Sequence, residues 1–172
     1  MSGVESKVEI RPMALEDLDA MFSIDRKIRA AGKAITYVNL TTEHIFAIDR
    51  KVSRQKRPTG YVDLITRDVT GLLDLGFVAE VDGHVRGFIL GQVAHIGETA
   101  TEIGLILILG VHPDYQRRGI AANLANALCE KYRSKGIKTV RIGVDQRDKD
   151  LVGFAEYMGF SVGHLIDYSK TL

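Results

Sequence analysis

Hydrophobic and polar positions follow regular periods over most of the chain. Val8–Arg11 alternates apolar and polar residues before Pro12, which predicts a short first strand. Over Ala14–Arg29 apolar residues return at helical spacing and acidic residues gather at the amino end, so a helix is expected there. Thr42–Ile48 also has a helical pattern, and residues 53–60 form a polar, cation-rich loop that is most simply a solvated surface.

From Phe77 onward the pattern becomes that of a sheet. Phe77–Val81 and Val85–Leu90 are apolar runs on either side of Asp82-Gly83, a pair that tolerates positive φ and therefore predicts a tight β-hairpin. Ile103–Val111 is almost wholly aliphatic, as expected for a strand that is buried on both faces.

The last third alternates helices and strands. A long helix is expected from Ile120 to its stop at Gly136, followed by a strand over Thr139–Val144. Leu151–Met158 predicts a short helix, and a final strand is expected from Phe160 to about Ser169. This order of elements predicts a mixed α/β sheet.

Length and charge narrow the function. The 172 residues have the size of one domain, so residues 1–172 are expected to form a single domain. With 23 basic and 22 acidic residues the formal charge is +1, which argues against a dedicated nucleic-acid-binding protein. Cys129 is the single cysteine, more readily explained as a core-filling thiol than as a nucleophile, and no Cys/His cluster has zinc-ligand spacing. No metal is therefore expected.

The ends and the apolar runs bear on location. The amino terminus lacks the basic start and apolar core of a secretory signal, and the longest apolar run is half of what a membrane-spanning helix needs. Together with the lone thiol, this predicts a cytoplasmic protein that does not act on membranes.

The most informative segment is the loop between the aliphatic strand and the long helix. The first N–H groups of a helix lack internal partners and carry partial positive charge, so they suit a phosphate. Gly119 lets the backbone approach an anion closely, Ala121 keeps the next turn small, and Arg117 and Arg118 add cationic donors. These residues predict a pyrophosphate cradle; the alternative is an ordinary helix start whose glycine serves packing.

Residues 77–163 resemble the GNAT acyltransferase superfamily. The resemblance rests on Gln116-Arg117-Arg118-Gly119-Ile120-Ala121 after Val111-His112-Pro113, and on the closing Glu156-Tyr157-Met158-Gly159-Phe160. Ile10-Arg11-Pro12-Met13 is similar to the opening strand of that family, whereas residues 30–76 match no pattern. The resemblance implies an α/β fold (an α+β sandwich) whose mixed, mostly antiparallel twisted sheet has splayed parallel central strands flanked by helices.

The resemblance implies acetyl-CoA as the acyl donor. Its pyrophosphate would lie on the amides of Arg117 to Ala121, and its pantetheine arm would pair like an extra strand with Leu109 to Val111. Gly110 is interpreted as a bulge or a simple strand bend, and an amide of Leu109 or Gly110 would face the thioester oxygen. The predicted coenzyme-binding residues are Leu109, Gly110, Val111, Gln116, Arg117, Arg118, Gly119, Ile120 and Ala121.

Catalysis in such proteins needs a base for the attacking amine and a proton for the leaving thiolate. Glu102 is the predicted base, although it lies further upstream than is usual, and His112 is interpreted as structural. The tyrosine that often protonates the thiolate is replaced by Ala155, so the donor is unknown, with Tyr168, Tyr132 or a water as alternatives.

Two functions follow. The first is an N-acetyltransferase that transfers acetyl from acetyl-CoA to an amine on a small molecule, a protein amino terminus or a lysine. The second, suggested by Ala155, is a non-catalytic or weakly catalytic acyl-CoA-binding regulator. The acceptor is not identified by the sequence, and a homodimer is expected only by family analogy.

Overall fold

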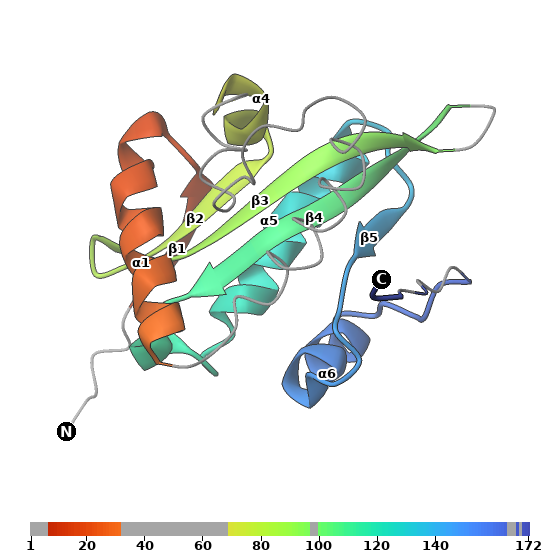
Figure 1. The fold of residues 1–172 in the computed structure, drawn as a ribbon. Coiled ribbons are helices and arrows are strands. Elements are labelled where there is room, and N and C mark those ends of the chain that lie inside the picture. The colour runs from red at the N-terminus through yellow and green to blue at the C-terminus, as the bar shows by residue number, and fades with distance from the viewer. Residues whose placement is uncertain (1–6, 32–68, 97–99, 165–167, 169) are drawn as a thin grey trace.

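The structure is a computed structural model that describes part of the chain, namely residues 7–31, 69–96, 100–164, 168 and 170–172. These residues form a five-stranded sheet in the order β1-β2-β3-β4-β5, in which only the β4–β5 pair is parallel (Figure 1). The predicted helix over Thr42–Ile48 and the loop at residues 53–60 lie outside the described residues.

The strands are β1 (Val8–Pro12), β2 (Gly76–Val81), β3 (His84–Ile96), β4 (Thr101–Val111) and β5 (Val140–Ile142). The helices are α1 (Leu18–Ala30), α4 (Val69–Asp74), α5 (Ile120–Ser134) and α6 (Lys149–Tyr157), with 3-10 turns η1 (Leu15–Asp17) and η2 (Pro113–Tyr115).

Helices cover both faces of the sheet. On one face α1 packs Met21, Ile24 and Ile28 against residues of β2, β3 and β4 such as Phe88 and Ile108. On the other face α5 packs against the same three strands, and α6 joins this second cluster. Figure 1 shows α1 and α5 on opposite sides of the long β3–β4 pair. The predicted α+β architecture is thereby confirmed.

The Asp82-Gly83 hairpin has the predicted form. Both residues have positive φ, 51° and 78°, as a two-residue turn between twisted strands requires. The strands that follow are longer than the pattern indicated, because β3 and β4 continue pairing to Ile96 and Thr101, beyond the end of β2.

The bulge in β4 lies at Leu107, so its predicted position at Gly110 is wrong. Leu90 pairs with Ile108 but Gly91 pairs with Ile106, which leaves Leu107 as the extra residue. Gly110 pairs regularly with Phe88, and a Cβ at Gly110 would lie 2.7 Å from the Phe88 ring. Its glycine is therefore required by the aromatic ring on the α1 face rather than by a bulge or bend.

The parallel pairing of β4 with β5 is brief. It comprises Gly104 with Val140, Leu105 with Arg141 and Ile106 with Ile142, after which β5 ends while β4 continues for five more residues. The predicted splayed pair is thus confirmed, although the strand expected over Thr139–Val144 is shorter.

The carboxyl-terminal strand predicted from Phe160 does not begin as expected. Phe160 donates its N–H to the Ala155 carbonyl at 3.0 Å, and Gly159 has a φ of 85°, so both residues serve the end of α6. Residues 160–164 are not in a strand, and residues 165–167 and 169 lie outside the described part of the chain.

An ion-pair cluster fixes β1 to its neighbours. Arg11 donates to Asp17 at 2.7 and 2.8 Å and to Glu80 of β2 at 2.7 Å. Asp17 is buried and also accepts the Ala14 N–H at 2.8 Å. The hydrogen bond from Arg11 lowers the pKa of Asp17, so this carboxylate remains charged in the folded protein.

Tyr132 anchors α5 to the sheet. Its ring lies over Gly104, and its hydroxyl donates to the Leu105 and Gln92 carbonyls at 2.6 and 3.1 Å. A Cβ at Gly91 would overlap that hydroxyl, and a Cβ at Gly104 would lie 2.7 Å from the ring. The aromatic side chain therefore fits only because both strands carry glycine beneath it.

This fit predicts coupled effects of two substitutions. Gly91→Ala should lower the free energy of unfolding by about 2 kcal/mol or more because of overpacking against the Tyr132 hydroxyl. In a Tyr132→Phe background the same substitution should cost clearly less, since the overlapping oxygen is absent. Urea denaturation of the four proteins measures the coupling.

The control is Gly153→Ala on the exposed side of α6, where a Cβ would meet nothing within 4 Å. It should leave stability unchanged or raise it slightly. Equal costs of Gly91→Ala in the two backgrounds would show that the hydroxyl does not cause the strain.

Candidate functional site

The loop between β4 and α5 is folded back on itself. His112 precedes η2 and accepts the Asp114 N–H on Nδ1 at 3.2 Å, while Tyr115 donates its N–H to the His112 carbonyl at 2.8 Å. The Gln116 side-chain amide then donates to the Val111 carbonyl at 3.1 Å. These bonds fix the path by which the chain leaves the strand and enters the helix.

The backbone at the start of α5 is left-handed at two positions. Arg117 has a φ of 64° and Gly119 a φ of 78°, and both are exposed together with Arg118. A Cβ at Gly119 would meet no atom within 4 Å, so this glycine serves backbone conformation and an open surface, and the packing alternative is not supported. The first N–H groups of the 15-residue helix α5 lack partners within the helix and lie in its positive dipole potential, next to this exposed glycine.

Cations surround this helix start. The guanidinium carbon of Arg118 lies 5.0 Å from the centre of the Tyr115 ring, and that of Arg86 from β3 lies 4.9 Å from the same centre. The Nε of Arg86 is buried and has no hydrogen-bond partner among the described residues. Within the described residues Arg86, Arg117 and Arg118 form no ion pair with an acid, so the site offers cationic donors that an anion would satisfy.

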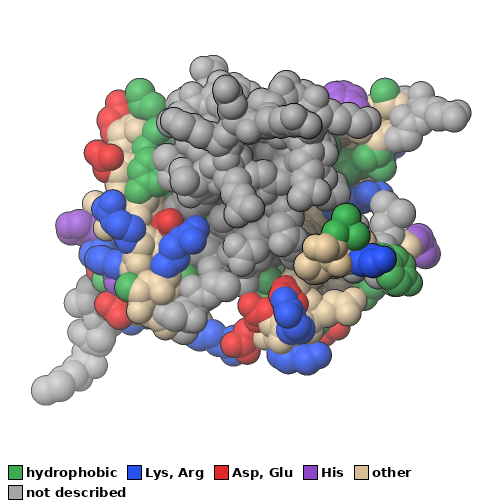
Figure 2. All heavy atoms as spheres, in the orientation of Figure 1, with side chains coloured by type: hydrophobic (Ala, Val, Ile, Leu, Met, Phe, Trp, Pro, Cys, Tyr) green, Lys and Arg blue, Asp and Glu red, His purple; other side chains and the backbone are tan. Residues whose placement is uncertain are grey.

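His112 connects this loop to α1. The side chain is buried, with its Nε2 3.2 Å from the Lys27 Nζ and its ring edge-on to Tyr115 at 5.4 Å between centres. Burial first, and the positive charge of Lys27 second, lower the pKa of His112, so the imidazole is neutral near pH 7. In the space-filling view Lys and Arg side chains gather at the left of the molecule, over the region of α1 (Figure 2).

The edge of β4 that faces away from β3 leads toward the helix start. The His112 N–H donates to the Arg86 carbonyl at 2.7 Å. Because residues of an antiparallel pair alternate in direction, the N–H and C=O of Gly110 point toward β3, whereas those of Leu109 and Val111 point toward the opposite edge. That opposite edge is the one from which β5 has departed after Ile142. Of the two predicted amides, only that of Leu109 points to this edge.

Glu102 lies apart from this edge. It is exposed near the beginning of β4, with Oε1 3.4 Å from the His95 Nε2. Seven residues separate it from Leu109, about 23 Å at roughly 3.3 Å per residue of strand. The structure does not bring Glu102 together with the loop.

The candidate proton donors are also scattered. Ala155 is buried, and the Tyr132 hydroxyl is hydrogen-bonded to backbone carbonyls in the core, where burial raises its pKa well above the usual range. Tyr157 and Tyr168 are 80% and 94% exposed. Asp148 caps α6 by accepting the Leu151 N–H at 3.1 Å.

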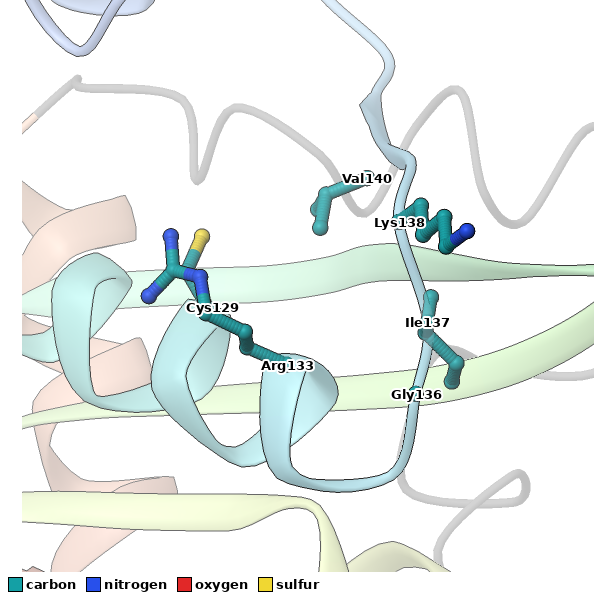
Figure 3. A pocket seen from close by; sticks show the side chains of 6 residues that line it. All are labelled: Cys129, Arg133, Gly136, Ile137, Lys138 and Val140. Atoms are coloured by element: carbon teal, nitrogen blue, oxygen red, sulfur yellow. The ribbon is translucent and has the colours of Figure 1, made fainter.

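Cys129 lines a separate groove near the carboxyl end of α5. Figure 3 shows its sulfur beside the Arg133 guanidinium, in a groove of about 450 Å³ that Val140 and Ile137 also border. Burial raises the pKa of the Cys129 thiol, so it is protonated at neutral pH. Ten residues of helix, about 15 Å, separate it from Gly119, which supports its interpretation as a packing thiol.

Comparison with known proteins assigns the family. The model of the acetyltransferase (GNAT) family matches residues 41–160, which is more than half of the chain. The chain belongs to the GNAT acetyltransferase family. The strand–loop–helix unit described above lies within the matched range.

Solved structures share the GNAT fold. An aminoglycoside acetyltransferase from an uncultured soil metagenomic sample is 19% identical, with a TM-score of 0.62 and 96% of each chain covered. The aminoglycoside N-acetyltransferase AAC(6')-Iy, crystallised with CoA, is 14% identical with a TM-score of 0.65 and 99% of each chain covered. A ribosomal-protein-alanine N-acetyltransferase from Brucella melitensis biovar Abortus 2308 is 16% identical, with a TM-score of 0.57 over 96% of this chain and 99% of that one.

The described residues contain neither a membrane-spanning helix nor a cluster of metal ligands. No helix there is long and apolar enough to cross a bilayer. No group of three or more His, Cys, Asp or Glu side chains in those same ranges could hold a metal ion.

The neutral state of His112 predicts a pH dependence of stability. In the unfolded chain this histidine has its ordinary pKa near 6.5, whereas in the folded protein the pKa is lower. As the pH falls below about 6.5 the unfolded state takes up a proton that the folded state does not, so stability should fall with pH until the folded pKa is passed. His112→Gln should remove this part of the slope in urea denaturation between pH 5 and 8.

The matched control is His84→Gln in the exposed hairpin, which should keep the wild-type slope. An unchanged slope in the His112→Gln variant would contradict a neutral, buried His112.

Proposed function

We propose that this chain is an N-acetyltransferase that transfers the acetyl group of acetyl-CoA directly to an amine. The observation that carries the proposal is the open, left-handed start of α5 at Arg117 and Gly119, surrounded by cations that lack acidic partners within the described residues. In a member of the GNAT acetyltransferase family this arrangement suits the phosphates of coenzyme A.

The residues present fit the coenzyme. The amides from Arg117 to Ala121 would hold the pyrophosphate, and the Arg86 Nε, buried without a partner, supplies a donor nearby that an anion would satisfy. The outward peptides of Leu109 and Val111 would pair with the pantetheine arm along the edge that β5 leaves. Gln116 already donates to the Val111 carbonyl, so the Val111 N–H and the Leu109 carbonyl would carry this pairing, which leaves the Leu109 N–H for the thioester oxygen.

Acetyl transfer requires control of charge at the thioester oxygen, the attacking nitrogen and the leaving sulfur. The Leu109 N–H is the donor oriented to stabilise negative charge that develops on the thioester oxygen. The attacking amine must be neutral, and Glu102 stays the predicted base; its distance along β4 means that it would act through water rather than by direct contact. The donor of a proton to the departing thiolate is not assigned.

One observation favours a second candidate, a non-catalytic or weakly catalytic acyl-CoA-binding regulator. Ala155 occupies the position of the usual tyrosine and is buried, and Tyr132 is committed to backbone carbonyls. Tyr157 and Tyr168 are exposed to solvent instead. A chain of this kind would bind acetyl-CoA without turning it over.

The acceptor is proposed only as an amine. The similar structures include enzymes named for aminoglycosides and for the alanine of a ribosomal protein, which are different kinds of amine. The proposed location is the cytoplasm, since a lone thiol suits a reducing compartment. A homodimer stays a prediction.

The decisive experiment measures thiol release from acetyl-CoA with a panel of aminoglycosides, polyamines and peptides with free amino termini. Turnover with any one of them, together with an acetylated product by mass spectrometry, supports the enzyme. Acetyl-CoA binding without turnover on the whole panel supports the regulator. Absence of both binding and turnover contradicts either function.

The cradle assignment is tested by Gly119→Asp against Gly119→Asn. Both side chains tolerate the left-handed backbone and have nearly the same shape, so the two variants differ in charge. The aspartate should bind CoA at least about tenfold more weakly than the asparagine, because its carboxylate would face the phosphates. Calorimetric titration with CoA measures the difference, and equal affinities with equal thermal midpoints would place the phosphates elsewhere.

A further inference from the structure

We infer that Tyr115 is a positioning residue for coenzyme A, whose ring holds the Arg118 and Arg86 guanidinium groups ready for the phosphates. The inference rests on the proposed function and deepens it. It starts from the two contacts of one ring, 5.0 Å to Arg118 and 4.9 Å to Arg86. Both distances are within the range in which an aromatic face attracts a cation.

The two arginines reach the ring from different elements. Arg118 belongs to the exposed loop just before α5, whereas Arg86 lies on β3, where its carbonyl receives the His112 N–H. Two positive groups beside one small ring repel each other, and within the described residues neither forms an ion pair with an acid. The ring lowers this cost, but an anion between or beside them would lower it further.

Other charges near the ring leave the site positive. His112 packs edge-on against Tyr115 and is neutral, and its Nε2 lies 3.2 Å from the Lys27 Nζ. The Asp114 side chain is the acid of this loop, and it is 84% exposed. Among the described residues, the potential beside Tyr115 is therefore set mainly by the arginines.

The Tyr115 ring also restrains the Arg118 side chain. An arginine on an exposed loop is free to take many rotamers, and ordering it on binding costs affinity. A guanidinium that already lies against Tyr115 has fewer conformations to lose, and its planar donors stay available at the edge. Tyr115 would thus act on affinity through Arg118 without touching the coenzyme.

The test compares Tyr115→Phe, which keeps the ring, with Tyr115→Leu, which removes it, in calorimetric titrations of the full chain with CoA. Tyr115→Phe should bind within about twofold of wild type. Tyr115→Leu should bind about fivefold more weakly, the effect of one cation–π contact of moderate strength. In steady-state assays the KM for acetyl-CoA should rise by the same factor while kcat at saturating donor stays unchanged.

A second background separates positioning from loss of structure. Arg118→Ala removes an exposed side chain and should itself weaken CoA binding, and in that background Tyr115→Leu should cost clearly less than fivefold, because only the Arg86 contact is left to lose. Thermal midpoints of all variants show whether the loop has unfolded. The same fivefold loss in both backgrounds would overturn the inference, as would equal losses for Phe and Leu at position 115.

The two failures are distinguishable. If wild type binds CoA and Tyr115→Leu binds it equally well, the positioning role is wrong and the proposed function stands. If wild type does not bind CoA at all, the proposed function and the positioning role are both wrong.

Discussion

The close approach of α5 to the sheet is the constraint on which the rest of the structure depends. Three glycines of β3 and β4 lie beneath this helix. A Cβ at Gly87 would lie 3.0 Å from Ile120 at the first turn, and Gly91 and Gly104 make room for Tyr132 near the last turn. Because the helix is seated at both ends, its amino terminus is placed beside the end of β4, where the loop proposed to bind the coenzyme forms. The position of the loop thus depends on three strand residues that have no side chain.

Local signals allowed much of the fold and the glycine turn at the centre of the candidate site to be predicted. Asp82-Gly83 encodes its turn in two residues, and Gly119 marks the helix start by a backbone conformation that few other residues adopt. The buried face of α5 follows from the helical spacing of its apolar residues. Each of these features depends on neighbours within a few residues, which is why a single sequence is enough to predict them.

Features that depend on distant residues were not predictable. Position 110 is a glycine because the Phe88 ring of the neighbouring strand β3 leaves no room for a side chain. The bulge at Leu107 leaves no sign in the sequence, because the run around it is uniformly aliphatic. The contacts of Tyr115 with Arg86 and of His112 with Lys27 join elements that are far apart in sequence. The residue types of the loop over 112–119 are compatible with such contacts, but no periodicity in the sequence encodes them.

The bulge at Leu107 has a consequence for how β4 tolerates change in length. Leu107 and Ile108 are consecutive, yet both pack on the α1 face, while Ile106 and Leu109 on either side pack on the α5 face. The strand therefore changes parity in its middle, and its two halves are in opposite phase. Away from Leu107, insertion or deletion of one residue would exchange the faces of an entire half, carrying glycines away from the aromatic rings that need them. Deletion of the bulged Leu107 would instead restore a regular alternation. Among descendants of this sequence, β4 should therefore tolerate a change in length at the bulge far more readily than elsewhere in the strand.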